Sequence, residues 1–315
     1  MIVVTGGAGF IGSNAVKKLN ELGTDNIIIV DNLGKSEKWK NLVGLKYADF
    51  YHKDEFLDLV VQDSVPFEVK AILHFGACSS TTEKDADYLI YNNFKYSQTL
   101  ATYALEKEAR FIYASSAATY GNGKEGYKDD EDNLNALKPL NMYGYSKHLF
   151  DLWVKREEVF DYIVGLKYFN VFGPNEYHKD EMRSLVHKAY VQIKETGKVQ
   201  LFKSYKPEYE NGKQMRDFIY VKDAVDMTLF FLQNDKCGLF NVGTGKARTW
   251  IDLVHAIFSA MNLEPKIDFI EMPDELKHKY QYFTEADITK IRDAGYDKEI
   301  TSLKEGVKQY VEKLK

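Results

Sequence analysis

Tyr143 and Lys147 have the side-chain types and the spacing of a proton-transfer pair. They stand at positions i and i+4 of a segment with helical periodicity, so both lie on one face of a helix, whereas Tyr145 lies on another. An unperturbed phenol has a pKa of about 10, so a neighbouring ammonium and a second positive charge at the site must together lower it before the phenolate can accept the proton of a substrate hydroxyl. The pair therefore predicts a general base, Tyr143, assisted by Lys147.

A serine pair precedes this helix, in the segment Tyr113-Ala-Ser-Ser-Ala-Ala-Thr-Tyr-Gly121. The pair ends an apolar run that is typical of a buried strand, and parallel strands present ligand-binding groups at their carboxyl ends. The Ser116 hydroxyl can therefore hydrogen-bond a substrate oxygen. Because Tyr-x-x-x-Lys alone is common in helices, the predicted catalytic set depends on Ser116, Tyr143 and Lys147 together with the glycine turn at the start of the chain.

That turn, Thr5–Gly12, follows the first apolar run and opens the first helical pattern. Gly6, Gly9 and Gly12 allow a tight turn, a close approach of pyrophosphate, and close contact between helix and strand. Phosphates then lie at the helix N-terminus, where free N–H groups favour negative charge. Asp31 ends the second apolar run, where the ribose-binding acid of a dinucleotide site belongs. The segment predicts a dinucleotide site; the alternative is a structural turn without cofactor.

The sequence does not decide whether the cofactor is NAD or NADP. Asp31 favours a free ribose hydroxyl and would repel a phosphate, which indicates NAD. Lys35, Lys38, Lys40 and Lys53 follow closely and could pair with a ribose phosphate, which indicates NADP. Each of these lysines could equally belong to a solvated basic loop.

Short apolar runs alternate with longer helical patterns through the first half of the chain. The runs predict buried parallel strands at Ile2–Thr5, Ile27–Asp31, Ala71–Phe75, Phe111–Ala114 and Ile163–Tyr168. The helical patterns cover Phe10–Leu22, Lys53–Gln62, Thr82–Glu108 and Asn141–Phe160. This alternation predicts the α/β fold class, with a Rossmann-type doubly wound parallel sheet.

The second half is less regular. Helices are expected near Glu181–Thr196, Val221–Gln233, Thr249–Met261 and Thr301–Leu314, with a polar loop at Lys203–Gln214. We expect a nucleotide-binding domain over residues 1–173 and a smaller α/β substrate-binding lobe over 174–315. A segment at about 215–245 is expected to return to the first domain.

The composition excludes several classes of function. The formal net charge is −5, so no whole-molecule field attracts nucleic acid or an anionic membrane. The two cysteines, Cys78 and Cys237, have no metal-ligand spacing, which predicts neither a disulfide framework nor a metal site. No apolar run reaches the roughly 18 residues of a spanning helix. The opening strand leaves no room for a secretory signal, so we expect a cytoplasmic protein.

Five segments together resemble the extended short-chain dehydrogenase/reductase family, over nearly the whole chain. They are Thr5–Gly12, Ser115–Gly121, Tyr143–Lys147, Asn170–Pro174 and Arg216–Asp223. Members of this family that act on sugar nucleotides oxidise the sugar with a bound nicotinamide cofactor. The resemblance therefore implies a Rossmann fold and a sugar-nucleotide enzyme.

Three segments are similar to the branch of this family that epimerises carbon 6 of ADP-heptoses: His74–Glu83, Tyr168–Pro174 followed by His178-Lys179, and Tyr280–Thr284. This resemblance implies an isomerase that supplies heptose for lipopolysaccharide, and it implies Lys179 as a second acid–base group. By itself, Lys179 in a polar loop is typical of a solvated surface residue. Asp180 and Glu181 depart from the family, which has small residues there.

The same resemblance implies ligand contacts and an assembly. The cofactor, NADP with NAD as the alternative, would contact Gly6, Gly9, Phe10, Ile11, Gly12, Asp31, Asn32, Lys38, Lys53, Phe75, Gly76, Ala77, Cys78, Ser79, Asn92, Lys147, Val171 and Lys179. The ADP-heptose substrate would contact Asn170, Glu181, Lys188, Phe202, Lys203, Ser204, Tyr205, Arg216 and Tyr280. The family also forms homo-oligomers, and the resemblance suggests a pentamer.

Two of the substrate contacts have alternatives in the sequence. The Arg216 guanidinium suits a diphosphate, but it could instead pair with Asp217 or Asp223. His187 could take the role of Lys188 if the alignment shifts by one residue.

Three other functions were weighed. A 4,6-dehydratase of this family needs an Asp-Glu pair directly after the catalytic serine or threonine, and Ala117 and Ala118 stand there. A UDP-hexose 4-epimerase needs only one tyrosine base and is the nearer rival. A catalytically silent NADP-binding module has no need for Ser116, Tyr143 and Lys147 together.

Overall fold

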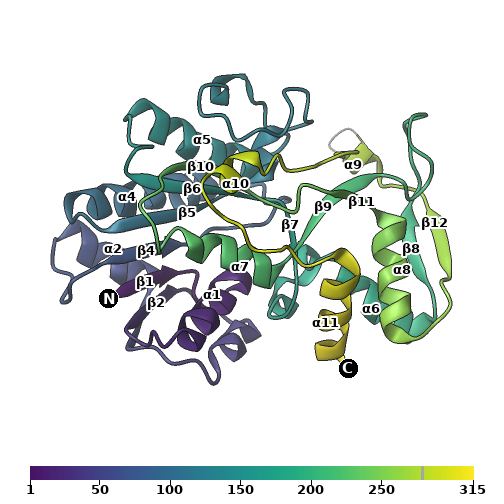
Figure 1. The fold of residues 1–315 in the computed structure, drawn as a ribbon, viewed down its shortest axis with the longest axis horizontal. Helices are drawn as coiled ribbons and strands as arrows, with labels where there is room; N and C mark the ends of the chain where they lie inside the picture. The colour runs from purple at the N-terminus through teal and green to yellow at the C-terminus, as the bar shows by residue number, and fades with distance from the viewer. Residues whose placement is uncertain (278–279) are drawn as a thin grey trace.

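Seven strands form one parallel sheet, in the order β10-β6-β5-β4-β1-β2-β3 (Figure 1). The computed structural model describes residues 1–277 and 280–315. The strands are β1 (Ile2–Thr5), β2 (Ile27–Asp31), β3 (Asp49–His52), β4 (Ala71–His74), β5 (Arg110–Ser116), β6 (Ile163–Tyr168) and β10 (Gly238–Val242). The strand order runs outward in both directions from β1 and β4. Such a switch point opens a crevice for ligands at the carboxyl ends of the strands.

Helices cover both faces of this sheet. One face packs against α1 (Phe10–Glu21) and α7 (Val221–Phe230), and the other against α2 (Lys53–Val61), α4 (Tyr96–Glu106) and α5 (Met142–Arg156). In β1, Val4 faces the first layer and Val3 faces the second. The strands are apolar on both sides because both faces are covered. No helix in the described ranges is long and apolar enough to cross a membrane.

The predicted α/β fold class with a doubly wound parallel sheet is confirmed. The first, second and last predicted strands have the expected bounds. The apolar pattern did not indicate β3, because this edge strand begins and ends with the exposed polar residues Asp49 and His52.

Two helical predictions need correction. The predicted helix at 82–108 is three segments: α3 (Ala86–Leu89), a π-helix (η2, Ile90–Lys95) and α4. Asp85 caps α3 by accepting a hydrogen bond from the Tyr88 amide at 2.9 Å, so the helix begins after it. The predicted helix at 181–196 begins only at Leu185 (α6, Leu185–Thr196), after the cap Ser184; Glu181 lies in a separate 3-10 helix (η5, Tyr177–Met182).

The second half of the chain adds smaller sheets and helices beside the main sheet. A three-stranded sheet contains β7 (Asn170–Phe172), β9 (Met215–Tyr220) and β11 (Ala247–Thr249), and a parallel pair contains β8 (Val199–Phe202) and β12 (Ile267–Ile270). The remaining helices are α8 (Trp250–Met261), α9 (Asp274–Lys277), α10 (Thr289–Asp293) and α11 (Leu303–Leu314), with 3-10 turns at η1 (Glu37–Leu42), η3 (Ala117–Tyr120) and η4 (Leu134–Ala136). Residues 203–214 form the predicted loop.

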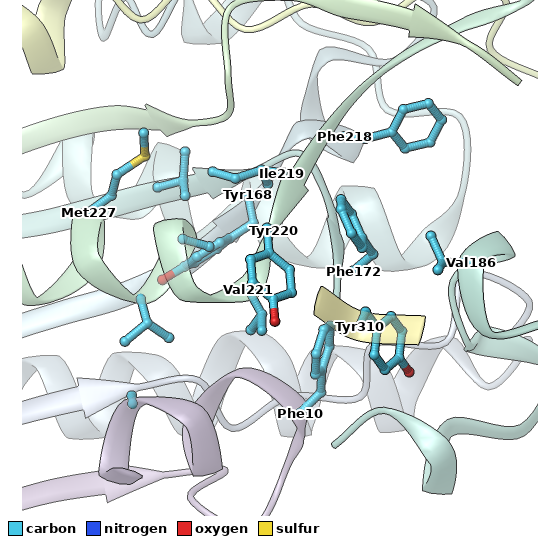
Figure 2. Packing of buried hydrophobic residues seen from close by; sticks show 14 of the residues in the cluster. Phe10, Tyr168, Phe172, Val186, Phe218, Ile219, Tyr220, Val221, Met227 and Tyr310 are labelled. Carbon is cyan, nitrogen blue, oxygen red and sulfur yellow. The ribbon is translucent and has the colours of Figure 1, made fainter. Parts of the chain in front are cut away.

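One hydrophobic core joins the main sheet to this second half. It contains Val4 from β1 and Tyr310 from α11, and Figure 2 shows Phe10, Phe172, Tyr220 and Tyr310 close together in it. The rings of Phe172 and Tyr220 have their centroids 5.6 Å apart. Because residues of α6, α8 and α11 belong to this shared core, these helices pack together with the main sheet as one unit. The division at residue 173 stays a prediction.

Candidate active site

A cavity of about 710 Å³ lies at the carboxyl ends of β1, β4, β5 and β6. It adjoins a smaller cavity of about 140 Å³ that shares Gly6, Asp31 and Lys38 with it. Together they are lined by all the predicted catalytic residues and by every predicted cofactor contact, from the glycine turn to Asn92 and Lys179. A larger groove, about 1030 Å³, lies beside α8 and α11 and contains none of these residues.

The turn after β1 has the shape of a phosphate cradle. Gly6 has a φ of +66°, which L side chains rarely adopt. A Cβ atom at Gly12 would collide with the carbonyl oxygen of Gly6, so the third glycine is required for α1 to start this close to the strand. The first turn of α1 carries no acidic side chain, and its free N–H groups favour an anion. These features fit the pyrophosphate of a dinucleotide.

Asp31 is buried at the end of β2, and protein donors already occupy its carboxylate. Oδ2 accepts a hydrogen bond from the Ala8 amide at 2.8 Å, and Oδ1 accepts one from the Asn32 amide at 2.7 Å. Lys38 Nζ forms an ion pair with Oδ1 at 2.7 Å. The negative charge of Asp31 is therefore balanced by Lys38, with Lys53 and Asn92 on the same cavity wall.

The segment after β4 is held by Asn93, which the sequence reasoning did not select. Asn93 Nδ2 donates to the Cys78 carbonyl at 2.9 Å and to Ser146 Oγ at 3.0 Å, and the Cys78 amide donates to Asn93 Oδ1 at 2.8 Å. Asn93 thus ties the predicted cofactor loop to the helix that carries Tyr143. Asn93 lies in the π-helix η2, which has more residues per turn than an α-helix, so its side chains point in different directions from those of an α-helix. A pattern search with a period of 3.6 residues therefore does not predict where Asn93 points.

The helix α5, which carries Tyr143 and Lys147, begins next to the end of β5. Asn141 caps it by accepting a hydrogen bond from the Gly144 amide at 2.8 Å, and a Cβ atom at Gly144 would lie 2.8 Å from the Ala118 carbonyl oxygen. This close approach brings Tyr143 next to Ser116, whose hydroxyl hydrogen-bonds the phenol. Tyr143, Lys147 and Ser116 all line the large cavity, whereas Tyr145 is 45% exposed on another face.

Burial is the main influence on the pKa values of Tyr143 and Lys147. Burial raises the pKa of Tyr143, and the hydrogen bond from Ser116 acts against this rise. Burial also lowers the pKa of Lys147 to about 8, although Asp151 opposes that shift. The pKa of Tyr143 was expected to fall through Lys147 together with the cation of a bound nicotinamide, and the protein groups alone do not produce that lowering. A further positive charge at the site is needed to make the phenol acidic.

Lys179 approaches the cavity from η5. Its Nζ lies 5.5 Å from the centroid of the Phe10 ring, and burial lowers its pKa while the nearby Glu176 raises it. Glu176 is buried, and its carboxylate accepts hydrogen bonds from the amide and hydroxyl of Ser184 at 2.5 and 2.6 Å. Asp180, the next residue, has a φ of +45°, a conformation in which glycine is less strained. This conformation gives a physical reason why a small residue suits the position.

A family model described as "NAD dependent epimerase/dehydratase family" matches residues 2–243. The chain belongs to the NAD dependent epimerase/dehydratase family. Two similar proteins are ADP-L-glycero-D-manno-heptose-6-epimerases: that of Nitratidesulfovibrio vulgaris is 57% identical over 99% of this chain and 97% of its own length, and that of Fusobacterium nucleatum is 51% identical with the same coverage. The Helicobacter pylori enzyme of that name has a solved structure that matches with a TM-score of 0.82, at 27% identity over 99% of this chain and 95% of that chain. The predicted resemblance to this epimerase branch, an isomerase class, is confirmed.

In this member of the epimerase/dehydratase family, the predicted substrate residues are spread over several places. Asn170 lines the large cavity. Lys188 instead contacts Glu181, whose side chain is 93% exposed, and His187 packs against Tyr310. Lys203 and Tyr205 contact Glu271, beside Phe202 and Ser204 in the β8 end and its loop.

Arg216 has neither of the acidic partners that were considered for it. Its guanidinium donates to the carbonyls of Met215 and Gln281 and lies over the rings of Tyr280, at 5.2 Å, and Trp250, at 5.6 Å. Asp217 accepts instead from Thr244, Gly245 and Ala286, and Asp223 accepts from Thr301. Trp250 Nε1 donates to Tyr280 Oη at 2.8 Å, and Trp250 also lines the large cavity. The Arg216 cluster therefore borders the cavity through Trp250.

Trp250, Glu176 and Arg183 line the cavity but were not selected from the sequence. Trp250 begins α8 and Glu176 precedes Lys179 by three residues. A tryptophan at the start of an apolar helix usually belongs to the core, so no local signal distinguishes it. Glu176 lies between the two stretches of the resemblance, Tyr168–Pro174 and His178-Lys179, and a carboxylate this close to a proposed acid–base lysine is a usable signal.

Proposed function

We propose that this chain interconverts ADP-D-glycero-D-manno-heptose and ADP-L-glycero-D-manno-heptose by transient oxidation at carbon 6. One observation carries the proposal: a single cavity is lined by a phosphate cradle, by Ser116, Tyr143 and Lys147, and by a second, half-buried amine, Lys179. The names of the relatives at 57% and 51% identity support the substrate. The role in supplying heptose for lipopolysaccharide follows from that substrate.

The residues divide the proton transfers between two elements. Tyr143 accepts the proton of the carbon 6 hydroxyl, and Ser116 hydrogen-bonds the same oxygen. Lys147 supplies positive charge that favours the phenolate. A nicotinamide cofactor held by the cradle would supply hydride transfer at carbon 6 and, in its oxidised form, a further positive charge.

Lys179 gives the product oxygen its proton. When the carbonyl turns its other face for reduction, its oxygen changes side, so a donor other than Tyr143 is required. Lys179 comes from η5 whereas Tyr143 comes from α5, and both line the cavity. Burial lowers the pKa of Lys179, which eases release of its proton at neutral pH.

The cavity disfavours two rival reactions. Ala117 and Ala118 follow Ser116 in η3 and carry no titratable group, so a dehydratase has no acid–base pair there. A UDP-hexose 4-epimerase needs one base, and Lys179 would then have no proton to move.

We infer NADP as the cofactor. Lys38 balances Asp31, and Lys53 lies on the same small cavity, so a ribose phosphate would meet two ammonium groups rather than a free carboxylate. A diphosphate would suit Arg216, which has no carboxylate partner among the described residues. The other predicted substrate contacts, a cytoplasmic location and a homo-oligomer, a pentamer by resemblance, stay predictions.

The substrate is tested by offering ADP-D-glycero-D-manno-heptose and UDP-glucose separately to the purified protein. NMR of the products should show inversion at carbon 6 of the heptose. Inversion at carbon 4 of the UDP-hexose would favour the 4-epimerase, and binding of cofactor without turnover would favour a silent module.

A further inference from the structure

A buried ion pair lies one turn beyond the catalytic lysine. Tyr143, Lys147 and Asp151 stand at positions i, i+4 and i+8 of α5, on one face of the helix. Asp151 Oδ2 forms an ion pair with Lys167 Nζ of β6 at 2.8 Å, and both side chains are fully buried. Such pairs are costly to desolvate and often contribute little to stability, so their presence beside catalytic residues calls for another reason.

Hydrogen bonds hold this pair in one arrangement. The Tyr113 hydroxyl donates to Asp151 Oδ1 at 2.9 Å, and the Ser115 hydroxyl donates to Oδ2 at 2.8 Å. Lys167 Nζ also donates to Thr119 Oγ1 at 2.6 Å. Tyr113 and Ser115 belong to the strand that ends at Ser116, so Asp151 joins the serine strand to the tyrosine helix.

The cluster contains two ammonium groups and one carboxylate. Lys147 and Lys167 are both buried; Asp151 forms an ion pair with Lys167 and lies one helical turn from Lys147, whose pKa its charge raises. With both lysines protonated the cluster has a net charge of +1, counted over these three side chains. Ionisation of the Tyr143 phenol brings this charge to zero, so the arrangement favours the phenolate that catalysis requires.

We propose that Asp151 and Lys167 are positioning residues that together set the charge of Lys147. Asp151 keeps the ammonium of Lys147 charged in a buried site. Lys167 offsets part of the negative charge of Asp151. The positive charge of Lys147 is therefore not fully cancelled by Asp151, and it still favours the phenolate of Tyr143. This inference rests on the proposed base role of Tyr143 and Lys147.

Burial shifts the pKa values of several other titratable groups that surround the cluster. Burial lowers the pKa of His148, on α5, and lowers that of His74, on β4, to about 3. Burial raises the pKa of Cys78, after β4, and raises those of Tyr113, on β5, and Tyr120, in η3, well above 10. Besides Asp151, the carboxylates that act on these tyrosines are Asp129, whose pKa burial raises to about 6, Glu131 and Asp287.

The test measures the pKa of Lys147 directly. NMR of isotope-labelled lysine side chains gives its titration, with the signal assigned by its loss in Lys147→Met. Asp151→Asn should lower the pKa of Lys147 by about 1 unit or more, because an attracting charge is lost and Lys167 is left unbalanced. Lys167→Gln should raise it by a similar amount, because Asp151 then acts on Lys147 alone.

The pH profile of kcat provides the second readout. Its alkaline limb should move to lower pH in Asp151→Asn and to higher pH in Lys167→Gln, since Tyr143 needs a protonated Lys147. Lys167→Arg keeps the charge and should restore the wild-type limb. Tyr113→Phe removes one hydrogen bond to Asp151 but no charge, so the pKa of Lys147 should stay unchanged.

Opposed shifts separate this role from a structural one. Unchanged titration of Lys147 in the two variants, or shifts in the same direction, would overturn the proposal. The variants are independent, so if one is insoluble the sign of the shift in the other decides. The titration needs no substrate; an inactive wild type with opposed shifts would therefore contradict the proposed function, while still showing that Asp151 and Lys167 set the charge of Lys147.

Discussion

The Lys179 ammonium lies over the ring of Phe10, with Nζ 5.5 Å from the ring centroid. Phe10 is the first residue of α1, directly after the glycine turn. The proposed second proton donor is therefore placed at the phosphate cradle, although the two residues are far apart in the sequence. A cation over an aromatic face gains up to about 2 kcal/mol when desolvated, which helps to hold this lysine in the cavity.

Replacement of Tyr143 by Phe should remove the base and leave the cavity shape intact. Turnover of the ADP-heptose should fall by roughly 10²–10⁴-fold, the range for positioned acid–base groups. Cofactor binding should be retained, because the glycine cradle is unchanged. Steady-state kinetics and cofactor titration measure both quantities, and near-normal turnover would rule out Tyr143 as the base.

Replacement of Lys179 by Met should lower turnover over a similar range, since the product oxygen loses its proton donor. The matched control is Lys194→Met. Lys194 also lies over a ring, 5.7 Å from the centroid of Tyr190, but it is exposed at the end of α6. Only the Lys179 variant should lose activity. If both variants turn over ADP-heptose like the wild type, the two-base mechanism is wrong and a single-base mechanism gains support.

Replacement of Lys38 by Met should weaken NADP binding more than NAD binding. Loss of a charge-assisted contact costs about 1.5–3 kcal/mol, or roughly 10–100-fold in Kd. The same change leaves Asp31 without its ion-pair partner and so increases repulsion of a ribose phosphate. Lys40→Met is the control, because Lys40 pairs with Glu37 at 2.7 Å on the surface. Calorimetry with both cofactors measures the ratio; equal losses for NAD and NADP would contradict the NADP assignment.

His74 should make the fold sensitive to acid. Its ring nitrogens hydrogen-bond Thr5 Oγ1 at 2.6 Å and Ser97 Oγ at 2.7 Å, and burial lowers its pKa to about 3. Between about pH 6.5 and pH 3 the unfolded state binds this proton and the folded state does not, so stability is lost as pH falls. From pH 7 to pH 5 the loss due to His74 is about 2 kcal/mol.

Thermal or denaturant unfolding at pH 7 and pH 5 tests whether His74 causes the loss of stability in acid. His74→Gln should reduce the difference in unfolding free energy between the two pH values, whereas the exposed His255→Gln should leave it as in the wild type. An unreduced difference in His74→Gln would show that other groups carry the acid sensitivity.

The main sheet and the glycine turn after β1 could be predicted because each depends on residues close together in the sequence. The glycine turn, the strand that ends at Asp31 and the Tyr143–Lys147 spacing each depend on local sequence and on one element. Their positions on one cavity follow from the parallel order of β1, β4, β5 and β6.

The rest depends on contacts between distant segments. Asn93 faces Cys78 only because a π-helix interrupts its helix, and Trp250 meets the cavity only because α8 packs beside β9. Arg216 could have paired with either neighbouring aspartate, and the choice between them and Tyr280 is made by tertiary structure. Among the protein groups alone, burial outweighs the neighbours of Tyr143 and raises its pKa; the expected fall also needs the cation of a bound nicotinamide.

Deuterium at carbon 6 of ADP-D-glycero-D-manno-heptose tests the central claim most directly. If Tyr143 and Lys179 serve an oxidation and reduction at that carbon, the wild-type product has the inverted configuration and keeps its deuterium, in water, as NMR and mass spectrometry would show. A product that is inverted at carbon 6 but has exchanged its deuterium for solvent hydrogen would contradict the account.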